Sequence, residues 1–189
     1  MSELKMEKLS KQQVKELYET NMQTDFPADE IKPLEMLLKA MDKGNYDALG
    51  LVEEGKIRAY AFFFKVDKDY LFDYLAVSGG KRNQGLGTQF LEQIRAYYKN
   101  ADSIIGEVED PEYAKTEADR SMQERRIGFY LRNDCLDTGV KVQLYGVNYK
   151  VFEIKLGEQH SPEQIKALYK KLYKAMFSRL EYWKYVRVK

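Results

Sequence analysis

The sequence is poor in the residues that build disulfides and metal sites. Its 189 residues include a single cysteine, Cys135, and a single histidine. One cysteine excludes an internal disulfide, which suits a reducing compartment such as the cytoplasm. One cysteine and one histidine are also too few for the usual zinc sites of proteins, so we expect no metal.

An excess of one charge is missing too. Lysine and arginine number 31 and aspartate and glutamate 30, which leaves a net charge of +1. This balance provides no general attraction to nucleic acid or to an anionic membrane. The longest aliphatic and aromatic run, AYAFFF at 59–64, is far too short to cross a bilayer, and the first thirteen residues lack the apolar core of a secretory signal. We therefore expect a cytoplasmic protein with no nucleic-acid partner and no membrane partner.

The sequence does contain the pattern of a mixed α/β protein. Its apolar content of 44% is typical of globular chains. Runs rich in aromatic and β-branched residues predict strands, and apolar residues spaced three and four apart predict helices. The predicted order is two helices (9–21, and a second that Pro33 opens and Gly44 closes), three strands (46–54, 56–66 and 69–77), a helix (86–98), a strand (103–110), a helix in the second half of 112–134, two strands within 140–156 and a helix (161–183).

Local signals mark several element boundaries. Ser10 is the predicted N-cap of the first helix, and Ser161 followed by Pro162 that of the last. Glu54-Gly55 predicts a tight turn between the first two strands. The apolar face of the helix at 86–98 is predicted to carry Leu86, Phe90, Leu91, Ile94, Tyr97 and Tyr98, and that of the last helix Ile165, Leu168, Leu172, Met176 and Leu180. We expect one domain over 1–157 and an amphipathic helical extension over 158–189 that packs on it.

A glycine-rich segment, LAVSGGKRNQGLGTQFL at 75–91, joins a buried strand to a helix. The first N–H groups of a helix have no intrahelical acceptor and carry the positive end of the helix dipole, so they attract phosphate. Gly85 and Gly87 allow a ligand to approach the backbone, and Arg82 adds charge. The segment predicts a phosphate site, although the glycines could also serve only to shape a turn. A dinucleotide-binding fingerprint fails because Phe90 stands where its third glycine belongs, and a P-loop fails because no Lys-Ser or Lys-Thr follows Gly87.

The segment resembles the acyl-CoA-binding motif of the GNAT superfamily of acetyltransferases. The motif Arg/Gln-x-x-Gly-x-Gly/Ala is matched by residues 82–87, five residues after Val77, and RRIGFYLRNDC at 125–135 lies where the second motif of the family belongs. The resemblance covers residues 1–156. It implies a mixed, mostly antiparallel sheet flanked by helices and splayed between the fourth and fifth strands, with an added C-terminal helix.

The resemblance also implies a cosubstrate, acetyl-CoA, and the residues that bind it. Main-chain groups of Leu75 and Val77 would hold the pantetheine arm. The pyrophosphate would lie on the loop amides, which fall on Arg82, Asn83, Gln84, Gly85, Leu86, Gly87 and Thr88.

The implied reaction is the direct attack of a primary amine on the thioester within a ternary complex. The amine must lose a proton and the departing thiolate needs one. Tyr130, in the second motif, is the candidate donor to sulfur. The candidate bases are Asp73, Glu107 and Glu109, each of which could instead have a structural role. An acid inside an apolar strand, such as Asp73, is costly unless it is paired or useful.

The acceptor amine and the oligomeric state are less constrained. The resemblance places acceptor contacts between the two N-terminal helices, where Phe26, Asp29 and Glu30 could receive a cationic small molecule or peptide, and it leaves a homodimer open. The second motif departs from the family at Gln123, Arg126 and Asp134-Cys135. These departures keep an alternative in view, namely a catalytically silent module with this fold that binds CoA or a protein partner.

Overall fold

The strands of the chain form one sheet, which we describe from a computed structural model. The structure describes residues 4–28, 30–77 and 85–189. Across these residues the strand order is β1-β2-β3-β4-β5-β7-β6-β8. The sheet is antiparallel except between β4 and β5, which are parallel, so the predicted mixed and mostly antiparallel α/β fold is confirmed.

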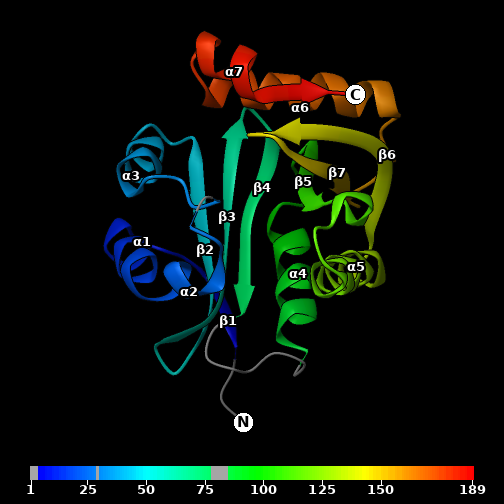
Figure 1. Ribbon diagram of the computed structural model, residues 1–189. Coiled ribbons are helices and arrows are strands. Elements are labelled where there is room, and N and C mark those ends of the chain that lie inside the picture. The colour runs from blue at the N-terminus through cyan, green and yellow to red at the C-terminus, as the bar shows by residue number, and fades with distance from the viewer. Residues whose placement is uncertain (1–3, 29, 78–84) are drawn as a thin grey trace. The chain divides into compact units, whose positions relative to one another are not determined.

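The elements divide between two compact units. The first comprises residues 1–65 and 72–97, and the second residues 66–71 and 98–189. In the first unit, Figure 1 shows α1, α2 and α3 gathered on one side of β2 and β3. Its elements are β1 (Lys5–Lys8), α1 (Lys11–Leu17), a π-helical turn (Tyr18–Met22), α2 (Gln23–Asp25), α3 (Leu34–Asp42), β2 (Tyr46–Glu53), β3 (Lys56–Val66), most of β4 (Asp69–Val77) and α4 (Leu86–Tyr97).

Sequence-local signals set the ends of these elements. Ser10 caps α1 through a reciprocal capping box with Gln13. Glu54 and Gly55 both have positive φ, as the predicted turn between β2 and β3 requires. β1 was not predicted from the sequence, because its four residues, KMEK, carry no apolar pattern; its pairing with β2 places it in the sheet.

The core of the first unit is aromatic. Six consecutive residues of β3, Ala59–Phe64, are buried, as the almost continuous apolar run predicts. The rings of Phe63 and Phe72 stack with centroids 4.8 Å apart. On α4, Leu86, Phe90, Leu91 and Ile94 are buried as predicted, whereas Tyr97 is 50% exposed and does not belong to the apolar face.

The second unit contains the first three residues of β4 and the chain from residue 98 onward. Asp102 N–H donates to the Lys68 carbonyl (2.9 Å) and the Ser103 hydroxyl to Asp69 (2.6 Å), so β4 and β5 start side by side. The predicted splay further along these two strands stays a prediction. The elements are β5 (Ser103–Glu109), a 3₁₀ turn (Pro111–Tyr113), α5 (Glu117–Arg132), β6 (Cys135–Leu144), β7 (Val147–Ile154), α6 (Pro162–Met176), α7 (Arg179–Tyr185) and β8 (Val186–Val188).

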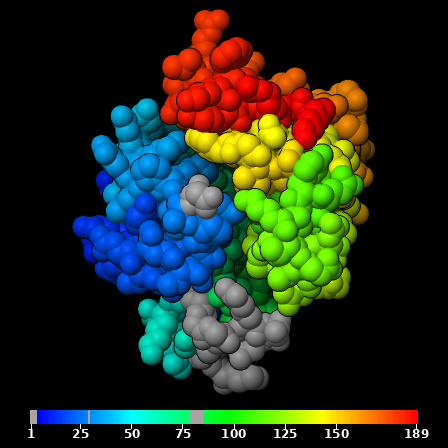
Figure 2. Space-filling view, viewed as in Figure 1, coloured from blue at the N-terminus to red at the C-terminus, as the bar shows by residue number. Residues whose placement is uncertain are grey.

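The C-terminal segment differs from the single helix predicted for 161–183. Ser161 caps α6 as expected, through a capping box with Gln164, but α6 ends at Met176 because Phe177 is extended and Ser178 caps a new helix, α7. The chain then adds β8 to the edge of β6. Leu180, predicted on the apolar face, is 73% exposed on α7, the red segment at the surface in Figure 2. The domain boundary at 157/158 stays a prediction.

Candidate functional site

The residue directly before α4 has a backbone conformation that glycine adopts more easily than any other residue. Gly85 has φ +76°, and a Cβ built there would meet no heavy atom within 4 Å. Gln89 N–H donates to the Gly85 carbonyl at 3.0 Å, the first intrahelical bond of α4. The amides of Leu86, Gly87 and Thr88 therefore precede that bond and have no intrahelical acceptor.

This geometry suits an anion, because those amides and the helix dipole favour negative charge. Leu75 and Val77 end β4 with half-buried side chains. Arg82, Asn83 and Gln84 lie outside the described residues.

Asp73 on β4 is held by two partners within the first unit. Lys32 Nζ lies 2.5 Å from Oδ1, and the Tyr46 hydroxyl donates to Oδ2 at 2.5 Å. The side chains of Lys32 and Asp73 are 17% and 6% exposed. Burial, followed by the charge of Asp73, raises the pKa of Tyr46 well above its ordinary value of 10.0, so this phenol stays a donor. The cost of burying the carboxylate is thus offset by pairing.

Phe26 and Glu30 meet at one tyrosine, Tyr74. The rings of Phe26 and Tyr74 contact edge to face with centroids 5.0 Å apart. The Tyr74 hydroxyl donates to the Glu30 carbonyl (2.8 Å) and accepts from Lys32 N–H (2.9 Å). The structure therefore brings Phe26 and Glu30 together with Asp73, through Lys32 and Tyr74, as one polar and aromatic cluster. Asp29 lies outside the described residues.

Glu107 on β5 belongs to the second unit and contacts the C-terminal helix. The Tyr169 hydroxyl donates to Oε1, and the Tyr173 hydroxyl donates to Oε2 at 2.7 Å. Glu109, two residues along β5, has a different neighbour, Arg126 of α5, whose Nη1 lies 3.5 Å from the carboxylate. Strand alternation places the two acids on the same face of β5, but the partners of Glu107 come from α6 and the partner of Glu109 from α5.

Tyr130 on α5 packs against the sheet of the second unit. Its ring stacks on Phe152 with centroids 4.3 Å apart and planes 19° from parallel. Burial raises the pKa of the Tyr130 phenol above its ordinary value of 10.0, although the charge of Arg126 opposes the shift. The phenol is therefore protonated at neutral pH and is a weaker acid than a free tyrosine.

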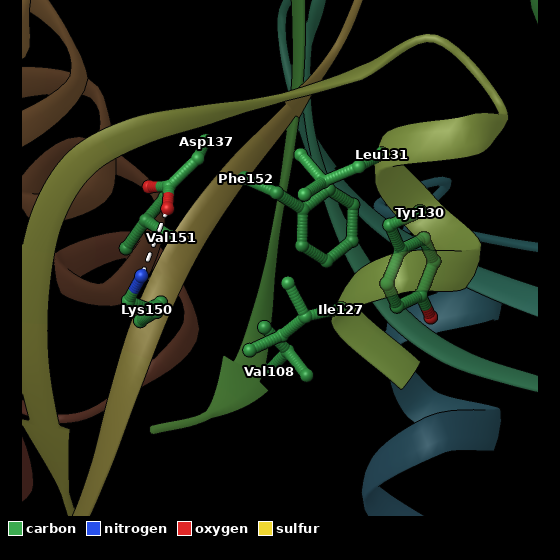
Figure 3. A pocket seen from close by; sticks show the side chains of 8 residues that line it. All are labelled: Val108, Ile127, Tyr130, Leu131, Asp137, Lys150, Val151 and Phe152. Atoms are coloured by element: carbon green, nitrogen blue, oxygen red, sulfur yellow. Dashed lines mark hydrogen bonds and ion pairs between the residues drawn. The ribbon is translucent and has the colours of Figure 1, made fainter. Parts of the chain in front are cut away.

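A small apolar pocket adjoins Tyr130 (Figure 3). Val108, Ile127 and Leu131 line it together with Phe152, and an ion pair lies on its other side. Gly106 on β5 allows Phe152 to lie close, because a Cβ there would be 2.3 Å from Cζ of that ring. The Phe152 ring can therefore occupy its place in the pocket wall only because residue 106 has no side chain.

The sequence did not single out Lys32, Tyr46, Tyr74, Tyr169 or Tyr173. Lys32 and the strand tyrosines could be recognised only after the loop at 26–33 folds onto β4. The α6 tyrosines did carry a signal, because a spacing of four residues places them on one helix face. The predicted apolar face of this helix consists of Leu, Ile and Met residues and does not include them.

Two properties of the described residues concern the membrane and metal ions. None of their helices combines the length and apolar character needed to cross a membrane. They also contain no cluster of three or more His, Cys, Asp or Glu side chains arranged to hold a metal ion.

Comparison with known proteins gives likeness in structure but not in sequence. No protein-family model matches the chain, and no curated protein matches it. A Bacteroides thetaiotaomicron protein described as a GNAT-family acetyltransferase is 21% identical and superposes with a TM-score of 0.69 over 89% of this chain and 96% of its own. The ribosomal-protein-S18-alanine N-acetyltransferase of Escherichia coli is 15% identical, with a TM-score of 0.61 over 84% of this chain and 97% of its own.

A third structure comes from Salmonella typhimurium and is described as an acetyltransferase with its cofactor acetyl-CoA. It is 15% identical, with a TM-score of 0.58 over 85% of this chain and 98% of its own. At such identities the likeness concerns the fold, and the order and directions of the strands agree with it. The chain therefore has the GNAT acyl-CoA N-acyltransferase fold.

Proposed function

We propose that the protein transfers an acetyl group from acetyl-CoA to a primary amine. The observation that carries the proposal is the junction of β4 and α4, where left-handed Gly85 precedes a helix whose first amides have no intrahelical acceptor. Such a junction suits a pyrophosphate, and the Salmonella protein of the same fold has acetyl-CoA as its cofactor. In the proposed complex, main-chain groups of Leu75 and Val77 hold the pantetheine arm.

In the proposed reaction the amine nitrogen attacks the thioester carbonyl carbon. The C–S bond then breaks, an amide forms and CoA leaves as a thiolate. A base must take the proton that the amine loses, and a donor must stabilise the sulfur. Phe26 and Glu30 are the proposed acceptor contacts.

Glu107 is the acid we propose as the base. The Tyr169 and Tyr173 hydroxyls, both uncharged donors, donate to its two oxygens and fix where the carboxylate lies. Asp73 is less suited, because its carboxylate is paired with the Lys32 ammonium at 2.5 Å.

Tyr130 is the proposed donor to sulfur. A thiol has a reference pKa of about 8.5 and a free phenol about 10, and burial of Tyr130 widens this gap. Full proton transfer from the phenol to the thiolate is therefore unfavourable. We propose that Tyr130 stabilises the leaving sulfur by a hydrogen bond.

The test of binding is stabilisation by acetyl-CoA. Ligand at a hundred times its Kd contributes about 2.7 kcal/mol, which for a chain of this size raises Tm by roughly 5–10 °C. Gly87→Glu places bulk and negative charge in the first turn of α4 and should abolish the shift. Gly157→Glu adds the same charge at an exposed glycine with no heavy atom within 4 Å of a built Cβ, and should keep it.

The test of catalysis is release of CoA thiol from acetyl-CoA across a panel of primary amines, with products identified by mass spectrometry. Turnover with at least one amine is expected, and Glu107→Gln should lower it. Binding of CoA without turnover would favour the silent module, and no stabilisation by millimolar acetyl-CoA would refute the site.

A further inference from the structure

The C-terminal helix α6 inserts two tyrosines against Glu107. Tyr169 and Tyr173 are fully buried, and their rings stack with centroids 4.5 Å apart. Each phenol donates to a different oxygen of the same carboxylate. The two donors therefore fix both the position of the carboxylate and the plane in which it lies.

The packing around the two rings leaves them little freedom. They lie one helical turn apart on α6, whose first turn is closed by the Ser161 capping box. Phe177, just past the end of the helix, contacts the Tyr173 ring edge to face with centroids 5.4 Å apart. Rigid neighbours of this kind hold a polar group in one geometry without further loss of entropy when it reacts.

The phenols also favour the charged form of the carboxylate. Burial, followed by the charge of Glu107, raises the pKa of Tyr169 well above its ordinary value of 10.0, so that hydroxyl keeps its proton. Hydrogen bonds donated to an ionised carboxylate stabilise it relative to the protonated acid. The tyrosine pair thus favours the ionised carboxylate, which is the form that a base must have before it takes a proton.

Other charged and titratable groups surround this acid. Along β5 and its neighbour β7 lie Glu109, which Arg126 of α5 approaches, and Tyr149, which pairs with Glu109 in register. The carboxylate of buried Glu153 on β7 is occupied by His160 through its ring and its backbone N–H. The experiment below leaves these groups unchanged, so a shift in its profile reports on the phenols.

Resting on the proposed function, we propose that Tyr169 and Tyr173 are positioning residues that hold Glu107 ionised and oriented as the base of acetyl transfer. The C-terminal helix is then part of the catalytic machinery and not only a cover for the sheet. A residue that acts through the base should change how turnover depends on pH while leaving the binding of acetyl-CoA unchanged.

The experiment measures kcat/KM against pH for Tyr169→Phe and Tyr173→Phe in the full chain. Each variant removes one hydrogen-bond donor and keeps the ring. We expect the acidic limb of the profile to move to higher pH by about one unit, since a lost hydrogen bond to a charged group favours protonation. The KM for acetyl-CoA should stay within about twofold, as expected when only the chemical step is affected. Tyr182→Phe, a half-buried tyrosine of α7, is the matched control and should leave the profile in place.

The outcomes separate the two proposals. Absence of turnover in the unaltered protein refutes the proposed function and this inference with it. Normal turnover with an unmoved acidic limb in both variants refutes the inference alone, even if Tm falls, because a merely structural role lowers stability without moving the profile. If either variant fails to fold, Glu107→Gln decides, since its amide oxygen still accepts from one phenol; turnover within tenfold of the unaltered protein would overturn the inference.

Discussion

The ion pair between Lys32 and Asp73 gives a sharp prediction about stability. Removing one partner of a buried pair leaves an uncompensated charge, which costs about 3–5 kcal/mol. The Asp73 side chain is 6% exposed and keeps its bond from Tyr46 when Lys32 is removed. We therefore place Lys32→Met at the low end, about 3 kcal/mol. Asp73→Asn leaves the lysine ammonium, which is 17% exposed, and should cost about 2 kcal/mol.

A double-mutant cycle distinguishes this pair from two independent contacts. The double variant contains no buried charge at this place, so its loss should be smaller than that of Lys32→Met, and the coupling energy should be at least about 2 kcal/mol. Urea unfolding at pH 7, followed by circular dichroism, measures each free energy of unfolding. Lys39→Met, at an exposed lysine of α3, is the control and should change stability by less than about 0.5 kcal/mol.

Two results would refute this reasoning. One is a loss below about 1 kcal/mol for Lys32→Met. The other is a double variant whose loss equals the sum of the single losses. The same variants test chemistry: if Asp73 only anchors the loop, the folded double variant keeps its turnover, whereas a base at this position would leave both Asp73 variants inactive.

Three further predictions follow from single contacts. Gly106→Ala should destabilise the protein by about 1–3 kcal/mol, because the new Cβ would lie 2.3 Å from the Phe152 ring; Gly157→Ala is its control, and equal stability of the two variants by urea unfolding would contradict the close packing. Burial raises the pKa of Asp137, but hydrogen bonds from a lysine and a backbone amide outweigh it and lower that pKa below its ordinary 3.8. Asp137→Asn should therefore cost less than about 1 kcal/mol at pH 7, and the difference should shrink as the pH falls below 3.8 through the lowered pKa; a difference that does not change with pH would exclude the ion pair as its cause. Tyr130→Phe should lower kcat by about 10- to 100-fold, the worth of one hydrogen bond to a charged sulfur, with little change in the KM for acetyl-CoA; unchanged kcat in steady-state assays would remove Tyr130 from the mechanism.

The sequence predicts those features of the fold that are determined by residues close together in the chain. The capping boxes at Ser10 and Ser161, the Glu54-Gly55 turn and the buried run of β3 are each specified within a few residues. The glycine motif, read with the order of the elements, indicated the fold, because a strand, a glycine-rich turn and a helix are contiguous in the chain.

The tertiary structure decided what depends on residues distant in sequence. β1 (KMEK) carries no strand pattern and is placed in the sheet by the edge of β2, and β8 (VRV), although its valines favour a strand, has only three residues and is placed by the edge of β6. The sequence does not distinguish the surroundings of Asp73 from those of Glu107, because the pattern of an apolar strand does not show which residues face its carboxylate. The fold gives the first a lysine 41 residues away and the second two phenols from a helix more than 60 residues away. The pattern of a strand shows that a buried acid needs a partner, but only long-range packing brings a lysine to Asp73 and two phenols to Glu107.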